Sequence, residues 1–262
     1  MAERTSYPTG TPNWVDVGAA DVEGAHRFYR ELFGWEIMPG GEEVGYYAAC
    51  ALGGKPVAGI GARPDPSVPS RWSMYIASDD VDGTAKLITE HGGQLLTEPM
   101  DVMQFGRSCF ATDPTGGVFA VWQAVEHIGA GRVNEAGAFT WSELNTRDGA
   151  TADAFYRNVF GYGEPEQIGD GTSFDYTLWK VNGEVVCGRM QVDDQWPADM
   201  PAHWMVYFAV DNADTAAARV TELGGTVHSG PFDSPYGRLA VVADPWGATF
   251  SIIQPPDEPP TT

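Results

Sequence analysis

Near the start of the chain, hydrophobic and polar positions first alternate and then follow a helical period. In the segment 14–18, Trp14 and Asp16 fall on one face of a strand and two valines on the other, because strand side chains alternate. Apolar residues then recur every three or four positions between Asp21, a suitable N-cap, and Gly34, a suitable helix-ending glycine. The pattern predicts a short strand followed by an amphipathic helix.

This strand–helix pattern returns in the second half of the chain. Trp141 and Glu143 repeat Trp14 and Asp16 after 127 positions, and the N-cap recurs at Asp148 with the same spacing. Later landmarks repeat after 131 or 132 positions, among them Trp72 and Trp204, Arg107 and Arg238, and Asp113 and Asp244. Since the spacing changes between units, the insertions fall in loops, and the chain is an internal duplication.

Each half contains two units, and each unit has a strand, then a helix, then three strands. After the first helix, we expect the other elements of the first half at 46–50, 57–60, 72–77, 81–90 (a helix), 94–96, 107–111 and 118–122. We therefore predict an α+β protein with two tandem domains of two βαβββ units each, at 11–125 and 136–254. The connecting parts are a lead-in at 1–10, a proline-rich connector at 63–69, a linker at 126–135 and a proline-rich tail at 255–262 that we expect to fray.

Composition and charge narrow the class of protein. With 43% hydrophobic and 12% aromatic residues, the 262-residue chain can bury substantial cores. A net charge of −21 argues against nucleic acid and anionic membrane surfaces, which both attract basic proteins. The scattered Cys50, Cys109 and Cys187 form no CxxC pair and indicate reduced thiols. Without a leader pattern or an apolar run near about 18 residues, we expect a cytoplasmic protein.

Several motifs resemble one protein family. They are the strand before Asp21, the helix end Phe28-Tyr-Arg-x-x-Phe-Gly-Trp35, the Gly92-Gly93 pair, and Phe105-Gly-Arg with Asp113-Pro-Thr-Gly, all with counterparts in the second half. They resemble the vicinal oxygen chelate superfamily, the glyoxalase/bleomycin-resistance/dioxygenase group of bacterial and other proteins. More narrowly, the chain is similar to an actinobacterial two-domain subgroup of glyoxalase-like antigens, hydroxylases and accessory proteins of polyketide antibiotic pathways. The resemblance implies that each domain curls into an eight-stranded cup, and that the cup is the site.

The resemblance also implies where a family metal would bind. The corresponding positions, on the first, fifth and last strands of each half, are occupied by Trp14, Ser73 and Ala120, and by Trp141, Met205 and Ser251. These side chains do not suit a divalent metal, which needs imidazole, carboxylate or thiolate ligands. We expect no metal and no other cofactor; a displaced metal on Asp16, Glu143 or His203 is a rarer alternative.

The carboxylates Asp16 and Glu143 are the candidate chemical groups. Each lies two residues after a tryptophan and hence on the same, cup-facing side of its strand. A buried carboxylate needs a partner, and Arg107 and Arg238 are the candidates. The pairs are either structural pins of the cup, or a functional arrangement in which the carboxylate holds a ligand's amine or hydroxyl or acts as a general base.

Tryptophans supply the second clue to a ligand. They fall on strands that line or flank the cups, at Trp14, Trp72, Trp122, Trp141 and Trp204. Indole walls suit flat aromatic molecules or cations, although such residues also fill cores. Among the histidines only His203 borders a cup strand, and we add it to the candidate ligand contacts.

Two functions follow from these residues. The first is a metal-independent protein that binds a small aromatic or antibiotic-like molecule, as a monomer or homodimer. The alternative is an enzyme: a lyase, an isomerase or an accessory hydroxylase with Asp16 or Glu143 as general base, or a metal-dependent glyoxalase or dioxygenase.

Overall fold

The computed structural model describes residues 2–63, 65, 67, 69–169 and 174–256; positions 64, 66 and 68 of the connector and the tail from 257 lie outside the described residues. The elements up to the linker are β1 (Ala2–Glu3), β2 (Pro12–Ala19), α1 (Val22–Phe33), β3 (Glu36–Pro39), η1 (Glu42–Val44), β4 (Ala48–Leu52), β5 (Lys55–Ala62), β6 (Arg71–Ala77), α2 (Val81–Glu90), β7 (Gln94–Leu95), β8 (Met100–Val102), β9 (Gly106–Thr112) and β10 (Val118–Ala124). The second half contains β11 (Arg132–Val133), β12 (Phe139–Thr146), α3 (Gly149–Phe160), β13 (Glu166–Gly169), β14 (Asp175–Val181), β15 (Glu184–Gln191), β16 (His203–Ala209), α4 (Ala213–Glu222), β17 (Thr226–Ser234), β18 (Gly237–Ala243) and β19 (Thr249–Gln254).

These elements form the two predicted sheets, one from each half. The order of the second sheet is β13-β14-β15-β12-β16-β19-β18-β17, and the first sheet has the same order, β3-β4-β5-β2-β6-β10-β9-β7. In each sheet the first strands of the two units pair antiparallel at the centre, β2 with β6 and β12 with β16. The first sheet has nine strands instead of the expected eight, because β8 also pairs with β9.

The predicted helices begin and end for the expected reasons. Asp21 accepts a hydrogen bond from the backbone N–H of Gly24, and Gly34 closes α1 in the left-handed conformation at φ 73°. Helix α2 has the predicted bounds, Val81–Glu90. The prediction missed β3 and β8, which are short and mostly exposed and therefore lack an apolar pattern. None of the described helices is long and apolar enough to span a membrane.

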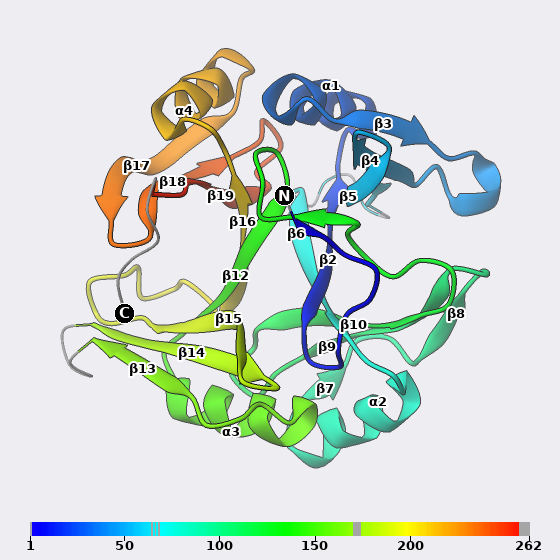
Figure 1. Ribbon diagram of the computed structural model, residues 1–262, viewed down its shortest axis with the longest axis vertical. Coiled ribbons are helices and arrows are strands. Elements are labelled where there is room, and N and C mark those ends of the chain that lie inside the picture. The colour runs from blue at the N-terminus through cyan, green and yellow to red at the C-terminus, as the bar shows by residue number, and fades with distance from the viewer. Residues whose placement is uncertain (1, 64, 66, 68, 170–173, 257–262) are drawn as a thin grey trace.

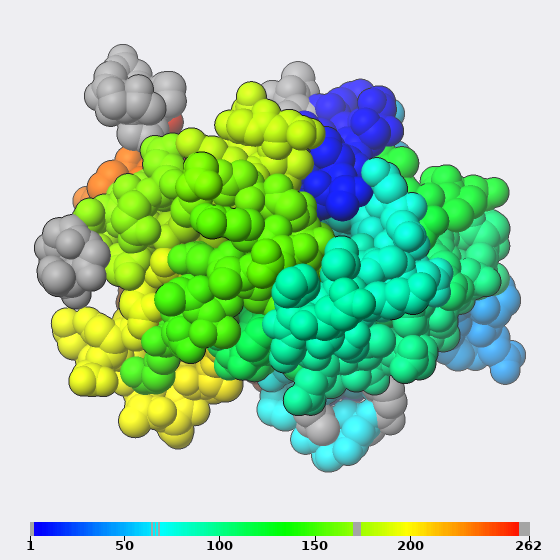
Figure 2. Space-filling view, turned by 90° about the horizontal axis from the view of Figure 1, so that it is seen from below, coloured from blue at the N-terminus to red at the C-terminus, as the bar shows by residue number. Residues whose placement is uncertain are grey.

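The two sheets stand back to back and curve away from each other, so that each concave face, or cup, opens to an opposite side of the molecule (Figure 1). We call the concave face of the first sheet cup 1 and that of the second sheet cup 2. The helices pair across the domain boundary, α1 with α4 and α2 with α3. Figure 2 shows α2 and α3 side by side on the face seen from below.

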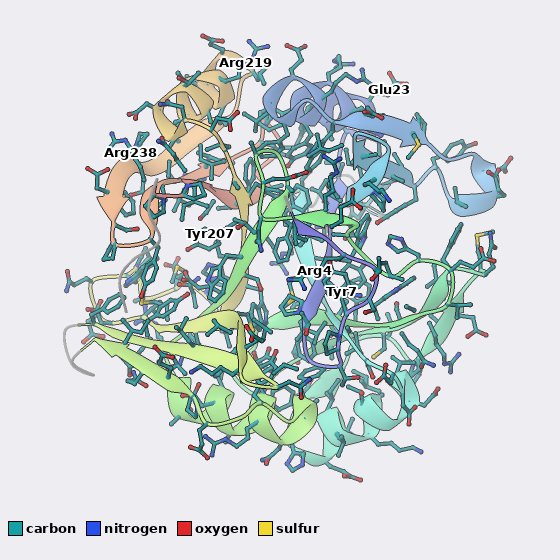
Figure 3. All side chains as sticks on the ribbon, in the orientation of Figure 1. Arg4, Tyr7, Glu23, Tyr207, Arg219 and Arg238 are labelled. Atoms are coloured by element: carbon teal, nitrogen blue, oxygen red, sulfur yellow. The ribbon has the colours of Figure 1, made fainter. Side chains whose placement is uncertain are left out.

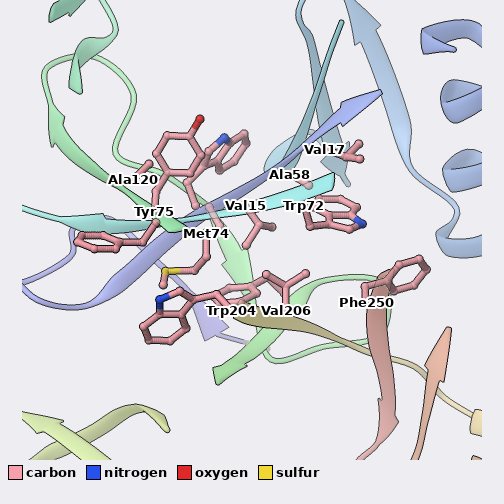
Figure 4. Close-up of a cluster of buried hydrophobic side chains, with 14 of the residues drawn as sticks. Val15, Val17, Ala58, Trp72, Met74, Tyr75, Ala120, Trp204, Val206 and Phe250 are labelled. Atoms are coloured by element: carbon pink, nitrogen blue, oxygen red, sulfur yellow. The ribbon is translucent and has the colours of Figure 1, made fainter. Parts of the chain in front are cut away.

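The main core lies between the convex faces of the two sheets. Trp72, Met74, Trp204, Val206 and Phe250 meet there (Figure 4), and all of them are buried. This placement corrects the expectation that Trp72 and Trp204 line a cup. They alternate with the cup-facing Ser73 and Met205 along their strands, so their rings point to the opposite side.

Matching tyrosine–aspartate bonds connect the domains. The hydroxyl of Tyr29 on α1 donates to Asp244 Oδ2 of the second domain at 3.0 Å and accepts from Trp72 Nε1 at 3.1 Å. The hydroxyl of Tyr156 on α3 donates to Asp113 Oδ2 of the first domain at 2.9 Å. Both aspartates also form the expected turns, because their Oδ1 atoms accept from backbone N–H groups.

Candidate functional site

The floor of cup 1 holds a hydrogen-bonded carboxylate, as the alternation of Trp14 and Asp16 predicts. Asp16 Oδ2 accepts from the hydroxyl of Tyr75 at 2.8 Å and from that of Tyr47 at 3.2 Å. Tyr47 in turn accepts from Trp14 Nε1 at 2.9 Å. The four side chains come from β2, β6 and the residue preceding β4, so the curvature of the sheet brings them together.

Cup 2 repeats this arrangement with a longer acid. Glu143 Oε1 accepts from the hydroxyl of Tyr207 at 2.9 Å and from Asn145 Nδ2 at 3.3 Å. Trp141 Nε1 donates to the hydroxyl of Tyr176 at 2.8 Å. The duplication has therefore preserved a set of one tryptophan, one carboxylate and two tyrosines on both concave faces.

A glycine faces each carboxylate from the neighbouring strand. Asp16 pairs in register with Gly59, and Glu143 with Gly188. A Cβ atom on Gly59 would lie 1.8 Å from the Tyr47 hydroxyl, and one on Gly188 would lie 2.3 Å from the Tyr176 hydroxyl. The missing side chain lets each tyrosine lie flat across its strand, close to the acid.

Burial changes the acid–base properties of the floor. Burial raises the pKa of Asp16 to about 6. Hydrogen bonds from Tyr75, Tyr47 and Ser73 favour the ionised form and lower the pKa, but by less than burial raises it. Burial also raises the pKa of Glu143, against hydrogen bonds from Tyr176, Tyr207 and Asn145. Asp16 is partly exposed, whereas only 8% of Glu143 is accessible, so cup 1 presents the more reachable acid.

The wall of cup 1 is aromatic and includes a linker residue. The His127 ring meets the Trp14 ring edge-on at a centroid distance of 4.4 Å, and the His127 carbonyl accepts from Trp122 Nε1 at 2.7 Å. The Tyr75 ring meets the rings of Phe110 and Trp122 edge-on, at centroid distances of 5.6 and 6.4 Å. Burial lowers the pKa of His127 to about 4, so the imidazole is neutral at pH 7.

Arg107 and Arg238 do not lie in the cups, and the prediction that they pair with the cup carboxylates is wrong. Arg107 forms ion pairs with Asp82 of α2 and with Asp101, both at 2.9 Å. Arg238 likewise forms an ion pair with Asp214 of α4, on the outer side of the second sheet. Tyr207 instead points into cup 2 (Figure 3). Alternation explains the error, because Arg107 lies next to the cup-facing Ser108 and must face the helix.

The other candidates lie on the cup sides of their strands. Trp122 pairs in register with Ser108 and faces cup 1. His203 begins β16 opposite Asn145, at the edge of cup 2, and its Nδ1 lies 2.9 Å from the Pro201 carbonyl oxygen. The three thiols are free, as expected, and all of them are buried; Cys187 packs on the helix side beside the Tyr162 hydroxyl.

The donor groups of the cups do not fit the metal that the fold family implies. The described residues contain no group of three or more His, Cys, Asp or Glu side chains that could hold a metal ion. In cup 1 the single carboxylate is surrounded by phenol and indole groups, and Ser73 and Ala120 occupy two of the three family ligand positions. A divalent cation needs more nitrogen, sulfur or anionic oxygen donors than this floor offers.

The sequence interpretation missed the tyrosines of the floor. Tyr75 and Tyr207 are 132 positions apart, the spacing already evident for the neighbouring tryptophans, and Tyr47 and Tyr176 are 129 apart. Repeated spacing was therefore an available signal. His127 has no such signal, because only the path of the linker brings it to the cup.

A family model for the Glyoxalase/Bleomycin resistance protein/Dioxygenase superfamily matches residues 11–121 and again 135–252. The chain belongs to this superfamily. Among relatives of this glyoxalase-superfamily chain, "Putative glyoxylase CFP32" of Mycobacterium tuberculosis is 41% identical over 97% of this chain and 98% of its own length. "Anthracycline biosynthesis protein DnrV" of Streptomyces peucetius is 32% identical, with 95% of each chain covered.

Solved structures of the superfamily share the fold. The Mn(II)-bound glyoxalase from Novosphingobium aromaticivorans aligns with a TM-score of 0.64 at 17% identity, over 94% of this chain and 82% of that one. The 2,3-dioxygenase LapB from Pseudomonas sp. KL28 also gives 0.64, at 14% identity and 98% coverage of both chains. At such identities the likeness concerns the fold alone.

Proposed function

We propose that this glyoxalase-superfamily chain is a metal-independent binding protein for small aromatic, antibiotic-like molecules, which it holds in its cups. The observation that carries the proposal is the duplicated set of tryptophan, carboxylate and tyrosines on both concave faces. Each set offers a flat apolar surface beside a hydrogen-bond acceptor, a combination that suits an aromatic ring bearing a hydroxyl or amine.

Two further observations support this function. The donor set of the cups does not suit the metals of glyoxalases and dioxygenases. The relative named as an anthracycline biosynthesis protein covers 95% of this chain, and anthracyclines are polycyclic aromatic molecules. We therefore choose hydroxylated anthraquinones as first probes.

The test combines metal analysis with ligand titration. We expect purified protein to contain no stoichiometric metal by plasma mass spectrometry and hydroxyanthraquinones to quench its tryptophan fluorescence saturably. Asp16→Asn and Glu143→Gln should each weaken binding at their own cup by roughly 3- to 10-fold, because a charged hydrogen bond to the ligand is replaced by a weaker, neutral one. Stoichiometric metal together with turnover of methylglyoxal–thiol adducts would instead support a glyoxalase.

A second candidate function is proton abstraction by Asp16. It rests on the raised pKa of this partly exposed carboxyl, about 6, which leaves it largely ionised yet basic at pH 7. In that case Asp16→Asn should remove most of the rate with a bound aromatic substrate while affinity survives. The rate of the wild-type protein should rise with pH around 6, and a binding protein would show no such profile.

A further inference from the structure

The two cups differ sharply outside their shared floor. Equivalent cup-facing pairs, with cup 1 first, are Gly61 and Met190, Ser73 and Met205, Ser108 and Leu239, Phe110 and Val241, and Trp122 and Ile253. Cup 2 is therefore lined at these five positions by apolar, non-aromatic side chains, all of them partly exposed. Cup 1 has small, polar and aromatic groups in their place, so the two cups present different chemistry to a ligand.

Two arginines lie at one end of cup 1. Arg71 pairs in register with Gly18, two residues beyond Asp16 on the cup side of β2. Arg63 follows β5, and the methylene groups of its side chain lie over Gly18: a Cβ atom on Gly18 would lie 3.2 Å from Arg63 Cγ. Both side chains therefore share the cup-facing side of the sheet with Asp16, one on each side of the central strand.

Neither arginine has a carboxylate within ion-pair distance in the described part of the chain, although the charge of Arg63 acts on the exposed carboxylate of Asp65 and, after the larger effect of hydrogen bonds from Ser67, lowers its pKa. The Nε atom of Arg63 is buried and has no hydrogen-bond partner, and neither guanidinium forms an ion pair there. Burial and hydroxyl hydrogen bonds, not a positive charge, set the pKa of Asp16. In a chain with a net charge of −21, two arginines beside a cup, one of them with a buried Nε that has no hydrogen-bond partner, are positions where an anion is favoured.

We propose that cup 1 binds hydroxylated aromatic acids, with Arg63 and Arg71 pairing with the acidic group and Asp16 accepting from the hydroxyl group. The proposal rests on the aromatic-binding function above. Two residues along a strand span roughly 7 Å, so one or two fused rings reach from Asp16 to the arginines. In cup 2 the equivalent positions are Val192 and His203, and no guanidinium is present at either.

The test compares 6-hydroxy-2-naphthoate with its uncharged carboxamide, which has the same rings and hydroxyl group. Protein labelled with 5-fluorotryptophan reports each cup separately by ¹⁹F NMR, with the Trp14 and Trp141 signals assigned from Trp14→Phe and Trp141→Phe. We expect the naphthoate to shift the Trp14 signal with an affinity at least about 10-fold above that of the amide, the difference made by a charged hydrogen-bond pair.

Variants separate the arginines from general charge effects. Arg63→Gln and Arg71→Gln should each lower naphthoate affinity by about 10-fold and leave amide affinity unchanged, which also shows that the cup is intact. Arg27→Gln, on the exposed face of α1, changes the net charge equally and should have no effect. Equal affinity for both probes, unchanged in the arginine variants, would overturn this inference but leave aromatic binding in place. If neither probe shifts Trp14 or Trp141 while hydroxyanthraquinones still quench the tryptophan fluorescence, this inference alone fails; if the anthraquinones fail as well, both proposals fail.

Discussion

At the scale of single residues, the acids in the cup floors have neutral hydrogen-bond donors, and within the described residues neither forms an ion pair. For Asp16 the cost of desolvation exceeds the benefit of its hydroxyl partners, and its pKa therefore rises to about 6. Neutral donors favour the ionised acid and lower its pKa, but here by less than burial raises it. A partner such as Arg107 would have lowered the pKa and occupied the carboxylate that we propose for ligand contact.

The raised pKa of Asp16 predicts a pH-dependent stability. The folded protein binds this proton more tightly than the unfolded chain, in which an aspartate has a pKa near 3.8. The contribution is thus fully present below about pH 4 and is lost as the pH rises through about 6. We would measure the free energy of unfolding of wild type and Asp16→Asn by chemical denaturation at pH 4 and at pH 7. From pH 4 to pH 7, the stability of the variant should rise relative to that of the wild type by on the order of 2 kcal/mol. A difference that is constant with pH would contradict the raised pKa.

At the scale of strands and helices, regular periodicity made most of the fold predictable. Caps and helix faces depend on neighbours in sequence, and α1, α2 and the presence of one sheet in each half follow the prediction. The direction of each strand side chain was also predictable, because successive side chains point to opposite faces of the sheet. Applied to Arg107, this rule would have placed it outside cup 1. The contact between His127 and Trp14 was not predictable, because these residues are 113 positions apart in sequence and only the path of the linker brings them together.

The glycine opposite each acid gives a prediction about strand packing. Gly59→Ala places a methyl group against Tyr47 and should push its hydroxyl away from Asp16. We expect a loss of about 1–3 kcal/mol in the free energy of unfolding, as for other overpacked sites, and weaker aromatic binding at the Trp14 signal. Gly163→Ala is the matched control, since its nearest neighbour would be a carbonyl oxygen at 3.9 Å. A Gly59→Ala protein with unchanged stability and binding would show that the close approach of Tyr47 is dispensable.

At the scale of the whole molecule, the back-to-back packing makes the duplication one structural body. Each domain supplies a helix tyrosine whose hydroxyl reaches an Asp-Pro turn of the other domain. The turns are visible in the sequence, but their second role is not, because it depends on how two complete domains meet. The cups are thereby held on opposite sides with their floors fixed to a common core, so the two proposed ligand sites are separate.

This packing predicts cooperative unfolding of the two domains. Tyr29→Phe and Tyr156→Phe each leave a buried aspartate oxygen without its donor, which should cost about 1–3 kcal/mol in the free energy of unfolding. Because each bond joins both domains, denaturant should still give one transition, with a lower midpoint and an unchanged slope. Tyr46→Phe, at an exposed tyrosine, should leave the midpoint in place. Two separate transitions in either core variant would mean that the domains are stable alone, and that the shared core contributes less to stability than the burial of its aromatic side chains indicates.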